Sequence, residues 1–329
     1  MRRRALLAAL AAAAAFPRTA FAATKPYRLY MVTWRGMTDA ETGFKDYLAR
    51  RAVNVQYTWR DAGQDRARLA EFAREIEAMK PDLVYTWGTS VTLGIAGTRD
   101  RPVPETASIP VVFSIVADPV GARIVPSLAR PGRDVTGVTH VAPLAAHLEA
   151  MRAYRPFTTV GVLFNSAEAN SVSAVEELRT ESRRGRFKLA EASFALGPDG
   201  RPHGEGIEER VAGLRAAGAE WLYLGPDTYL FTQISRVAAA AMRARLPTFA
   251  TTESYLDGES QVLAGLVCRF RQIGEFAAFK AEQILTGKRR ARQIPVETLA
   301  RFSFVVRMDV AKAIDILPPI TIFNYAELR

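Results

Sequence analysis

Two successive series of short apolar runs, separated by amphipathic stretches, constrain the fold of this chain more than any other feature. The first series has apolar runs at 27–33, 53–59, 83–87 and 111–115 and amphipathic stretches at 40–51 and 66–79. In the last stretch, Leu69, Phe72, Ile76 and Met79 recur on one stripe, as the 3.6-residue helical repeat requires. Strands that alternate with helices at these spacings favour a parallel sheet covered on both faces.

The same pattern then starts again, which indicates a second lobe. Strands are predicted at 160–164, 187–194, 221–224, 248–250, 261–267 and 302–306, and helices at 171–182, 234–244, 273–285 and 310–316, with a further helix ending at 217. The repeated order of strand and helix predicts an α/β fold of two doubly wound parallel-sheet lobes with a hinge.

The N-terminus has the three parts of a secretory signal peptide. Residues 2–4 are arginines, an apolar run covers 5–16, and Ala20 and Ala22 are small residues spaced for a signal peptidase. The run is too short to span a bilayer, which takes about 20 residues. We expect residues 1–22 to be a signal peptide cleaved after Ala22, and the mature protein to be periplasmic. A buried N-terminal helix is the alternative, and both the Sec and the twin-arginine routes stay open.

The net charge of +10 comes from basic residues scattered along the chain. Small clusters at 183–186 and 288–292 could contact nucleic acid, or they could be solvated helix ends. Because the protein is expected to be exported, we predict no nucleic-acid partner. Cys268 is the only cysteine in the sequence, so a disulfide within the chain is impossible. Stability must therefore come from packing.

Polar residues follow several of the predicted strands. Ligands of open α/β sheets bind in the crevice beyond the carboxyl ends of the strands, so these residues are candidates to line a binding site. The candidates are Trp34, Thr89, Ser90, Asp118, Asn165, Asp227, Thr252 and Glu253.

Some of these candidates suggest the chemistry of the ligand. Thr89 and Ser90 open a predicted helix, where hydroxyls, backbone N–H groups and the helix dipole suit a carboxylate. The alternative is that they only cap the helix. Asp227 and Glu253 suit a ligand ammonium group, with solvated loop acids as the alternative. Trp34 would supply a flat apolar wall.

Sequence motifs of catalysis are missing. His140, His147 and His203 have no metal-ligand spacing. The sequence around Ser90 lacks the second glycine of a nucleophile elbow, and no glycine-rich stretch continues into a dinucleotide-binding or phosphate-binding loop. We therefore predict that the protein is not an enzyme and that it uses no cofactor and no metal.

Eight short segments carry a further signal through their order along the chain. They are Ile109–Phe113, Ala117–Gly121, Ser127–Gly132, Val135–Gly137, Val160–Asn165, Asn170–Ser171, Phe302–Val306 and Ala311–Ala313. Together they resemble the ABC transporter substrate-binding family that includes tryptophan/tyrosine uptake proteins. The resemblance extends over nearly the whole mature chain. The segments 33–36 and 261–268 depart from the family pattern and leave the identity of the ligand open.

The resemblance implies a periplasmic binding protein type I fold whose lobes close on a ligand. It places Thr89, Ser90 and Asp118 on one wall of the cleft and Asn165 and Asp227 on the other.

The lobe boundaries follow from the same resemblance, together with the function. Lobe one is expected at 27–117 plus 251–293, and lobe two at 118–250 plus 294–329. The implied protein is the substrate-binding component of an ABC importer, a monomer that takes a small amino-acid-like or aromatic carboxylate ligand. Its partners would be an ABC permease and its ATPase, without insertion into the membrane. The alternatives are an exported sensor that signals to a receptor or kinase, and an exported α/β enzyme.

Overall fold

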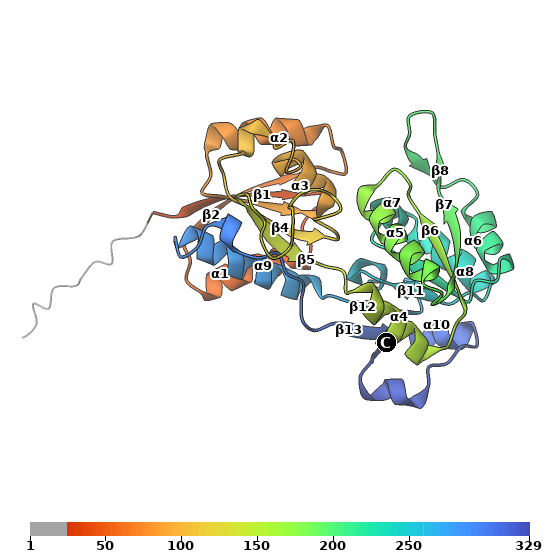
Figure 1. The fold of residues 1–329 in the computed structure, drawn as a ribbon. Coiled ribbons are helices and arrows are strands. Elements are labelled where there is room, and N and C mark those ends of the chain that lie inside the picture. The colour runs from red at the N-terminus through yellow and green to blue at the C-terminus, as the bar shows by residue number, and fades with distance from the viewer. Residues whose placement is uncertain (1–24, 259) are drawn as a thin grey trace, which may run out of the picture.

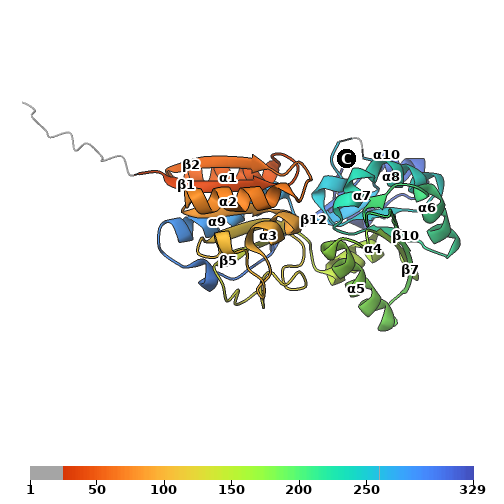
Figure 2. The same cartoon turned by 90° about the horizontal axis from the view of Figure 1, so that it is seen from above.

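The computed structural model describes residues 25–258 and 260–329, which form two lobes placed side by side (Figure 1). Each lobe is an open β-sheet with helices packed against it, and the view from above shows the same division (Figure 2). The fold prediction of two doubly wound lobes is therefore confirmed. The predicted signal peptide, residues 1–22, lies outside the described residues.

Lobe one is built on a five-stranded parallel sheet with the order β2-β1-β3-β4-β5. Its strands are β1 (Tyr27–Thr33), β2 (Val55–Asp61), β3 (Leu83–Trp87), β4 (Val111–Val116) and β5 (Val135–Thr139). β3 and β4 are buried along their whole length because helices cover both faces, whereas the edge strand β2 is only partly buried.

Four helices cover this sheet. α2 (Arg68–Met79) and α3 (Gly88–Ala96) pack together on one face, and α1 (Asp39–Arg50) and α9 (Phe270–Leu285) pack together on the other (Figure 1). α1 and α9 touch at two glycines. A Cβ added to Gly43 would lie 2.2 Å from the carbonyl oxygen of Arg271, and one added to Gly274 would lie 1.8 Å from that of Ala40. The absence of a side chain at both positions therefore lets the two backbones meet.

Lobe two is built on a seven-stranded sheet with the order β14-β13-β12-β11-β10-β6-β7. Its strands are β6 (Thr159–Phe164), β7 (Lys188–Ser193), β10 (Trp221–Leu224), β11 (Thr248–Ala250), β12 (Ala264–Val267), β13 (Ser303–Val306) and β14 (Glu327–Leu328). The pairs are parallel except β12 with β13, which are antiparallel. A short hairpin, β8 (Ala195–Leu196) with β9 (Pro202–His203), stands apart from the sheet.

Helices cover both faces of the second sheet as well. They are α4 (Leu144–Tyr154), α5 (Ala169–Arg183), α6 (Ile207–Ala216), α7 (Thr228–Thr232), α8 (Ile234–Arg243) and α10 (Met308–Ala313). Trp221 and Tyr223 join one buried apolar cluster, whereas Leu222 and Leu224 join the other. Successive side chains of β10 thus point to opposite faces, and each face has its own core.

Strand pairing corrects the predicted lobe boundaries. The prediction assigns 118–250 to lobe two, yet β5 pairs with β4 in the sheet of lobe one. It assigns 251–293 to lobe one, yet β12 pairs with β11 in the sheet of lobe two. Hydrophobic periodicity indicates a strand but does not say which sheet receives it, because pairing partners are distant in the sequence.

The chain crosses between the lobes after β5, after β12, and between the short 3-10 helix η3 (Ala291–Gln293) and β13. The first and third crossings run side by side, because the backbone N–H of Thr139 donates to the carbonyl of Glu297 at 2.9 Å. Lys280 of α9, almost fully buried, holds the third crossing by hydrogen bonds to Pro295 O (2.7 Å) and to the Glu297 carboxylate (2.6 Å). These crossings form the hinge.

Most predicted elements match the observed ones to within a few residues. β5, α4, α7 and the two-residue strands β8, β9 and β14 were not predicted, and the strand expected at 261–267 begins only at Ala264. Within the described residues, none of the helices combines the length and the apolar character that a membrane span requires.

Candidate functional site

A hollow lies between the lobes at the carboxyl ends of both sheets, with about 540 Å³ of unfilled space that is partly open to solvent. Its lobe-one wall comes from the ends of β1, β3, β4 and β5 and from the start of α9. Its lobe-two wall comes from the start of α5, the β10–α7 connection, α7 and the segment after β11. This is the crevice in which doubly wound sheets bind ligands.

The N-terminus of α3 faces this hollow. Gly88 has a φ of +82°, which lets the chain turn sharply from β3 into the helix without side-chain strain. No side chain caps the helix, so its first backbone N–H groups are available to a ligand. Thr89 is buried, with 7% of its surface exposed, and the hydroxyl of Ser90 accepts a hydrogen bond of 3.4 Å from Arg66. The helix start thus has the donors that a carboxylate needs.

The loop after β1 brings Trp34 and Arg35 to the same wall. It is held by a capping box at the start of α1, in which Glu41 accepts from the backbone and hydroxyl of Thr38, both at 2.7 Å. The ring nitrogen of Trp87 also donates to the Thr38 hydroxyl, at 3.3 Å. The capping box therefore fixes the loop against the end of β3 and orients both side chains.

Arg35 reaches across to lobe two. Its guanidinium lies 3.5 Å from the ring centroid of Phe231 in α7 and 5.1 Å from that of Trp87. Burial lowers the pKa of Arg35 below its usual value, while nearby Tyr255, Asp257 and Glu41 partly offset this effect. The side chain remains a cation at neutral pH, held between two aromatic faces.

Two buried carboxylates, Glu168 and Asp227, line the opposite wall. Asp227 caps α7 by accepting from the backbone of Leu230 at 2.8 Å, and it also accepts from Asn165 N and Ser171 Oγ, both at 2.6 Å. Burial, and then the charge of Glu168, raises the pKa of Asp227 to about 6. Among the described residues, neither carboxylate forms an ion pair with a basic side chain.

Tyr255 ties the two lobe-two loops together at the base of this wall. Its hydroxyl lies 2.8 Å from the carbonyl oxygen of Gly225 and 2.9 Å from that of Asp227. The side chain is fully buried and is among those that line the hollow, and its hydroxyl is a structural anchor. The acids of lobe two are thereby held in a rigid frame.

The end of β4 and the residue after β5 complete the lobe-one wall. Ile115 has a φ of +57°, a strained conformation for a β-branched residue, and the β4–β5 register shifts at this point. His140 is 5% exposed, and burial lowers its pKa to about 4, so its ring is neutral at neutral pH. A strained backbone beside a buried neutral imidazole is typical of a functional site.

Five of the eight predicted site residues line the hollow: Trp34, Thr89, Ser90, Asp227 and Thr252. The other three do not. Asp118 accepts from the Gly121 backbone at 2.8 Å and from the Ser173 hydroxyl across the lobes. Asn165 uses its side-chain oxygen to accept from Ala167 N at 3.0 Å. Asp118 and Asn165 therefore have supporting positions near the site, and neither side chain lies on the wall of the hollow.

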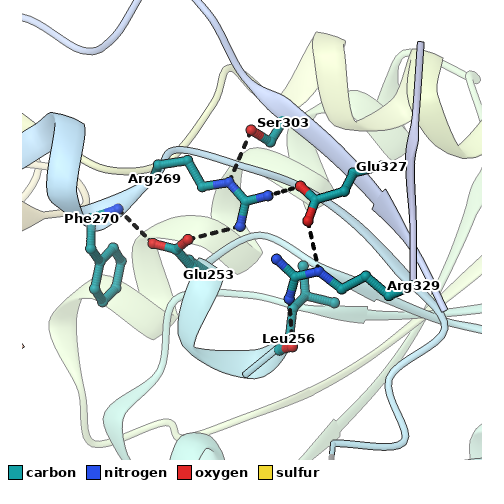
Figure 3. Close-up of polar contacts among 7 residues, drawn as sticks. All are labelled: Glu253, Leu256, Arg269, Phe270, Ser303, Glu327 and Arg329. Atoms are coloured by element: carbon teal, nitrogen blue, oxygen red, sulfur yellow. Dashed lines mark hydrogen bonds and ion pairs between the residues drawn. The ribbon is translucent and has the colours of Figure 1, made fainter. Parts of the chain in front are cut away.

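Glu253 lies in a polar network beside the hinge (Figure 3). Its carboxylate pairs with Arg269 at 2.8 Å and accepts from the backbone N–H of Phe270, the first residue of α9. Arg269 also pairs with Glu327, which in turn pairs with Arg329 (Figure 3). Because its oxygens are committed to these partners, Glu253 joins a lobe-two loop to α9 and does not face the hollow.

Several residues of the site were not among the predicted candidates, and the charged or ring-bearing ones include Arg35, His140, Glu168 and Phe231. Arg35 follows Trp34 directly, so the same strand-end argument could have included it. Glu168 stands four residues after a strand end, at the start of a helix, a position that the argument could also have reached. His140 and Phe231 had no comparable signal, because β5 and α7 were not predicted. No group of metal-ligating side chains occurs within the described residues.

Comparison with known proteins gives a consistent result. Residues 29–328 match the model of a family described as ABC transporter substrate binding protein. A tyrosine-binding protein of Clostridioides difficile (strain R20291) is 24% identical over 277 residues, which are 84% of this chain and 73% of that protein.

Two solved structures have the same fold. A conserved domain protein from Vibrio cholerae matches with a TM-score of 0.79 and 24% identity, covering 93% of this chain and 100% of that one. An ABC domain from Streptococcus pneumonia in complex with L-Trp matches with a TM-score of 0.75 and 20% identity, covering 91% and 99%. At these identities the likeness to the solved structures establishes the shared fold alone.

Proposed function

Because this chain belongs to the ABC transporter substrate-binding protein family, we propose that it is the periplasmic binding component of an ABC importer and captures a zwitterionic, amino-acid-like ligand between its lobes. The observation that carries the proposal is the division of charge across the hollow. Donors line the lobe-one wall, and two buried acids without basic partners in the described residues line the lobe-two wall.

The ligand carboxylate would bind at the start of α3. The uncapped backbone N–H groups, the helix dipole and the hydroxyls of Thr89 and Ser90 all favour negative charge there. A hydrogen bond to a charged group contributes about 1.5–3 kcal/mol, so a few such bonds account for useful affinity.

The ligand ammonium group would face Glu168 and Asp227. Burial, and then repulsion from Glu168, raises the pKa of Asp227, and a cation placed between the two carboxylates removes the cost of that repulsion. Trp34, Trp87 and Phe270 would provide apolar walls for the body of the ligand. The L-Trp complex and the tyrosine-binding relative support an amino acid as the ligand.

The transport role carries further expectations. The protein would be exported with cleavage after Ala22, so N-terminal sequencing of periplasmic protein should begin at Ala23. It would act without catalysis and deliver its ligand to an ABC permease and its ATPase. Retention of the full-length chain in the cytoplasm would contradict this role.

Thermal denaturation with a panel of L-amino acids and aromatic carboxylates tests the binding proposal. A ligand at 100 times its Kd stabilises the bound state by about 2.7 kcal/mol, which raises the melting temperature by several degrees. Thr89→Val should weaken binding of the active compound about tenfold or more. Thr180→Val, on the far part of α5, is the matched control and should leave affinity unchanged. A panel without any stabilising compound refutes the proposal.

A further inference from the structure

The lobe-one wall offers more donors than one ligand carboxylate can use. Arg35 is the clearest case, because its planar guanidinium has five N–H donors. Among the described residues, no acceptor forms a hydrogen bond or an ion pair with it, and its contacts are the faces of Phe231 and Trp87. The two rings stabilise the positive charge, but they leave the N–H groups at the edge of the guanidinium free.

Two further polar atoms of this wall have no partner within the described residues. They are Nε1 of Trp34, on a side chain with 7% exposure, and Nδ1 of His140, on a side chain with 5% exposure. A buried polar atom without a hydrogen bond costs about 1–3 kcal/mol, so such atoms are rare in folded proteins. Both residues line the same hollow as Arg35, which indicates that a bound molecule supplies the missing partners. Trp34 Nε1 needs an acceptor, whereas His140 Nδ1 needs a donor, because the neutral ring of His140 already donates to the backbone of Val116.

Arg35 lies beside the start of α3, because one of its two aromatic contacts is Trp87, the N-cap residue of that helix. Arg66, which precedes α2, donates a hydrogen bond to Ser90. Arg35 instead extends toward α7, between Trp87 and Phe231. A carboxylate bound by the N–H groups and hydroxyls at the helix start has its oxygens committed there, which leaves the N–H groups of Arg35 and Nε1 of Trp34 without an acceptor. This surplus of donors points to a second acceptor group on the ligand.

We propose that the ligand carries a second carboxylate on its side chain, which accepts from Arg35 and Trp34. This inference rests on the proposed function and narrows the substrate to dicarboxylic amino acids or amino acids with an aromatic carboxylate. A bidentate contact suits the guanidinium fork, and the aromatic faces around it suit a planar group. Related proteins that take tryptophan or tyrosine would differ from this one in the charge of the ligand side chain.

Matched acid and amide probes test the second carboxylate by titration calorimetry. The pairs are L-glutamate with L-glutamine, and 4-carboxy-L-phenylalanine with 4-carbamoyl-L-phenylalanine. In at least one pair the acid should bind about tenfold tighter than its amide, because only the acid forms charged hydrogen bonds with Arg35. In Arg35→Met the acid and its amide should bind with about equal affinity, chiefly because the acid binds more weakly.

A second cation of the cleft provides the matched control. Arg66→Met removes a charge near the start of α3 and should affect both members of a pair equally, so the acid preference should persist. Melting curves of each variant establish that it is folded.

The results separate this inference from the proposed function. Tight binding of neutral amino acids without any preference for the acids, or a preference that survives in Arg35→Met, overturns the second carboxylate and leaves the proposed function standing. Failure of every amino acid, acidic or neutral, overturns both.

Discussion

Replacing Asp227 by alanine should weaken the fold as well as ligand binding. As a free loop acid, Asp227 would support little of the structure, but it is 6% exposed and accepts three hydrogen bonds from Leu230, Asn165 and Ser171. Through them it fixes the start of α7 and the end of β6. Asp227→Ala would remove all three acceptor contacts at once.

The magnitude follows from those contacts. Leaving a buried donor without an acceptor costs about 1–3 kcal/mol, and the loss of a helix N-cap alone costs about 1 kcal/mol. The variant gains back part of this, because a buried carboxylate no longer has to be desolvated. We expect a net loss of about 2–4 kcal/mol in the free energy of unfolding at pH 7.

The effect should depend on pH. Folding raises the pKa of Asp227 from 3.8 to about 6, so the folded state binds this proton more tightly than the unfolded state does. The stability that comes from the proton is fully present below about pH 4 and is lost as pH rises through about 6. The advantage of the wild type over Asp227→Ala should therefore grow by about 1–3 kcal/mol from pH 7 to pH 4.

Urea denaturation without ligand, followed by tryptophan fluorescence and circular dichroism, measures both quantities. Glu205→Ala, at a loop carboxylate with 88% side-chain exposure in the same lobe, is the control and should change stability by less than about 0.5 kcal/mol. A loss below about 1 kcal/mol for Asp227→Ala, or an advantage that shrinks toward pH 4, would refute the reasoning.

Two further variants test the packing of lobe one and the hinge. Gly274→Ala would push a Cβ into a backbone carbonyl of α1 and should lower the free energy of unfolding by at least about 2 kcal/mol in the same denaturation assay. Its control is Gly213→Ala, where a Cβ meets nothing within 4 Å, and this change should be neutral or stabilising. Glu253→Gln would break its charged contact with Arg269 beside the hinge and should lower stability by about 1–3 kcal/mol, while Asp199→Asn in an exposed ion pair should have almost no effect. If a variant and its control change the free energy of unfolding by the same amount, the expectation for that variant is wrong.

The sequence by itself determined the fold class and the edge of each sheet where the site lies. Apolar runs at strand spacing and stripes at helical spacing are local signals, and they identified most elements to within a few residues. The rule that ligands bind beyond the carboxyl ends of parallel strands then identified Trp34, Thr89, Ser90, Asp227 and Thr252, which line the hollow.

Only the tertiary structure decided what each polar side chain does there. Asp227 and Glu253 are both acids after strand ends, yet Asp227 lines the hollow while capping a helix, and Glu253 is paired with Arg269 beside the hinge. Likewise, β5 and β12 joined the sheets opposite to those expected. The partners of a carboxylate or of a strand are brought together by folding from distant parts of the chain, and local sequence holds no record of which groups will meet.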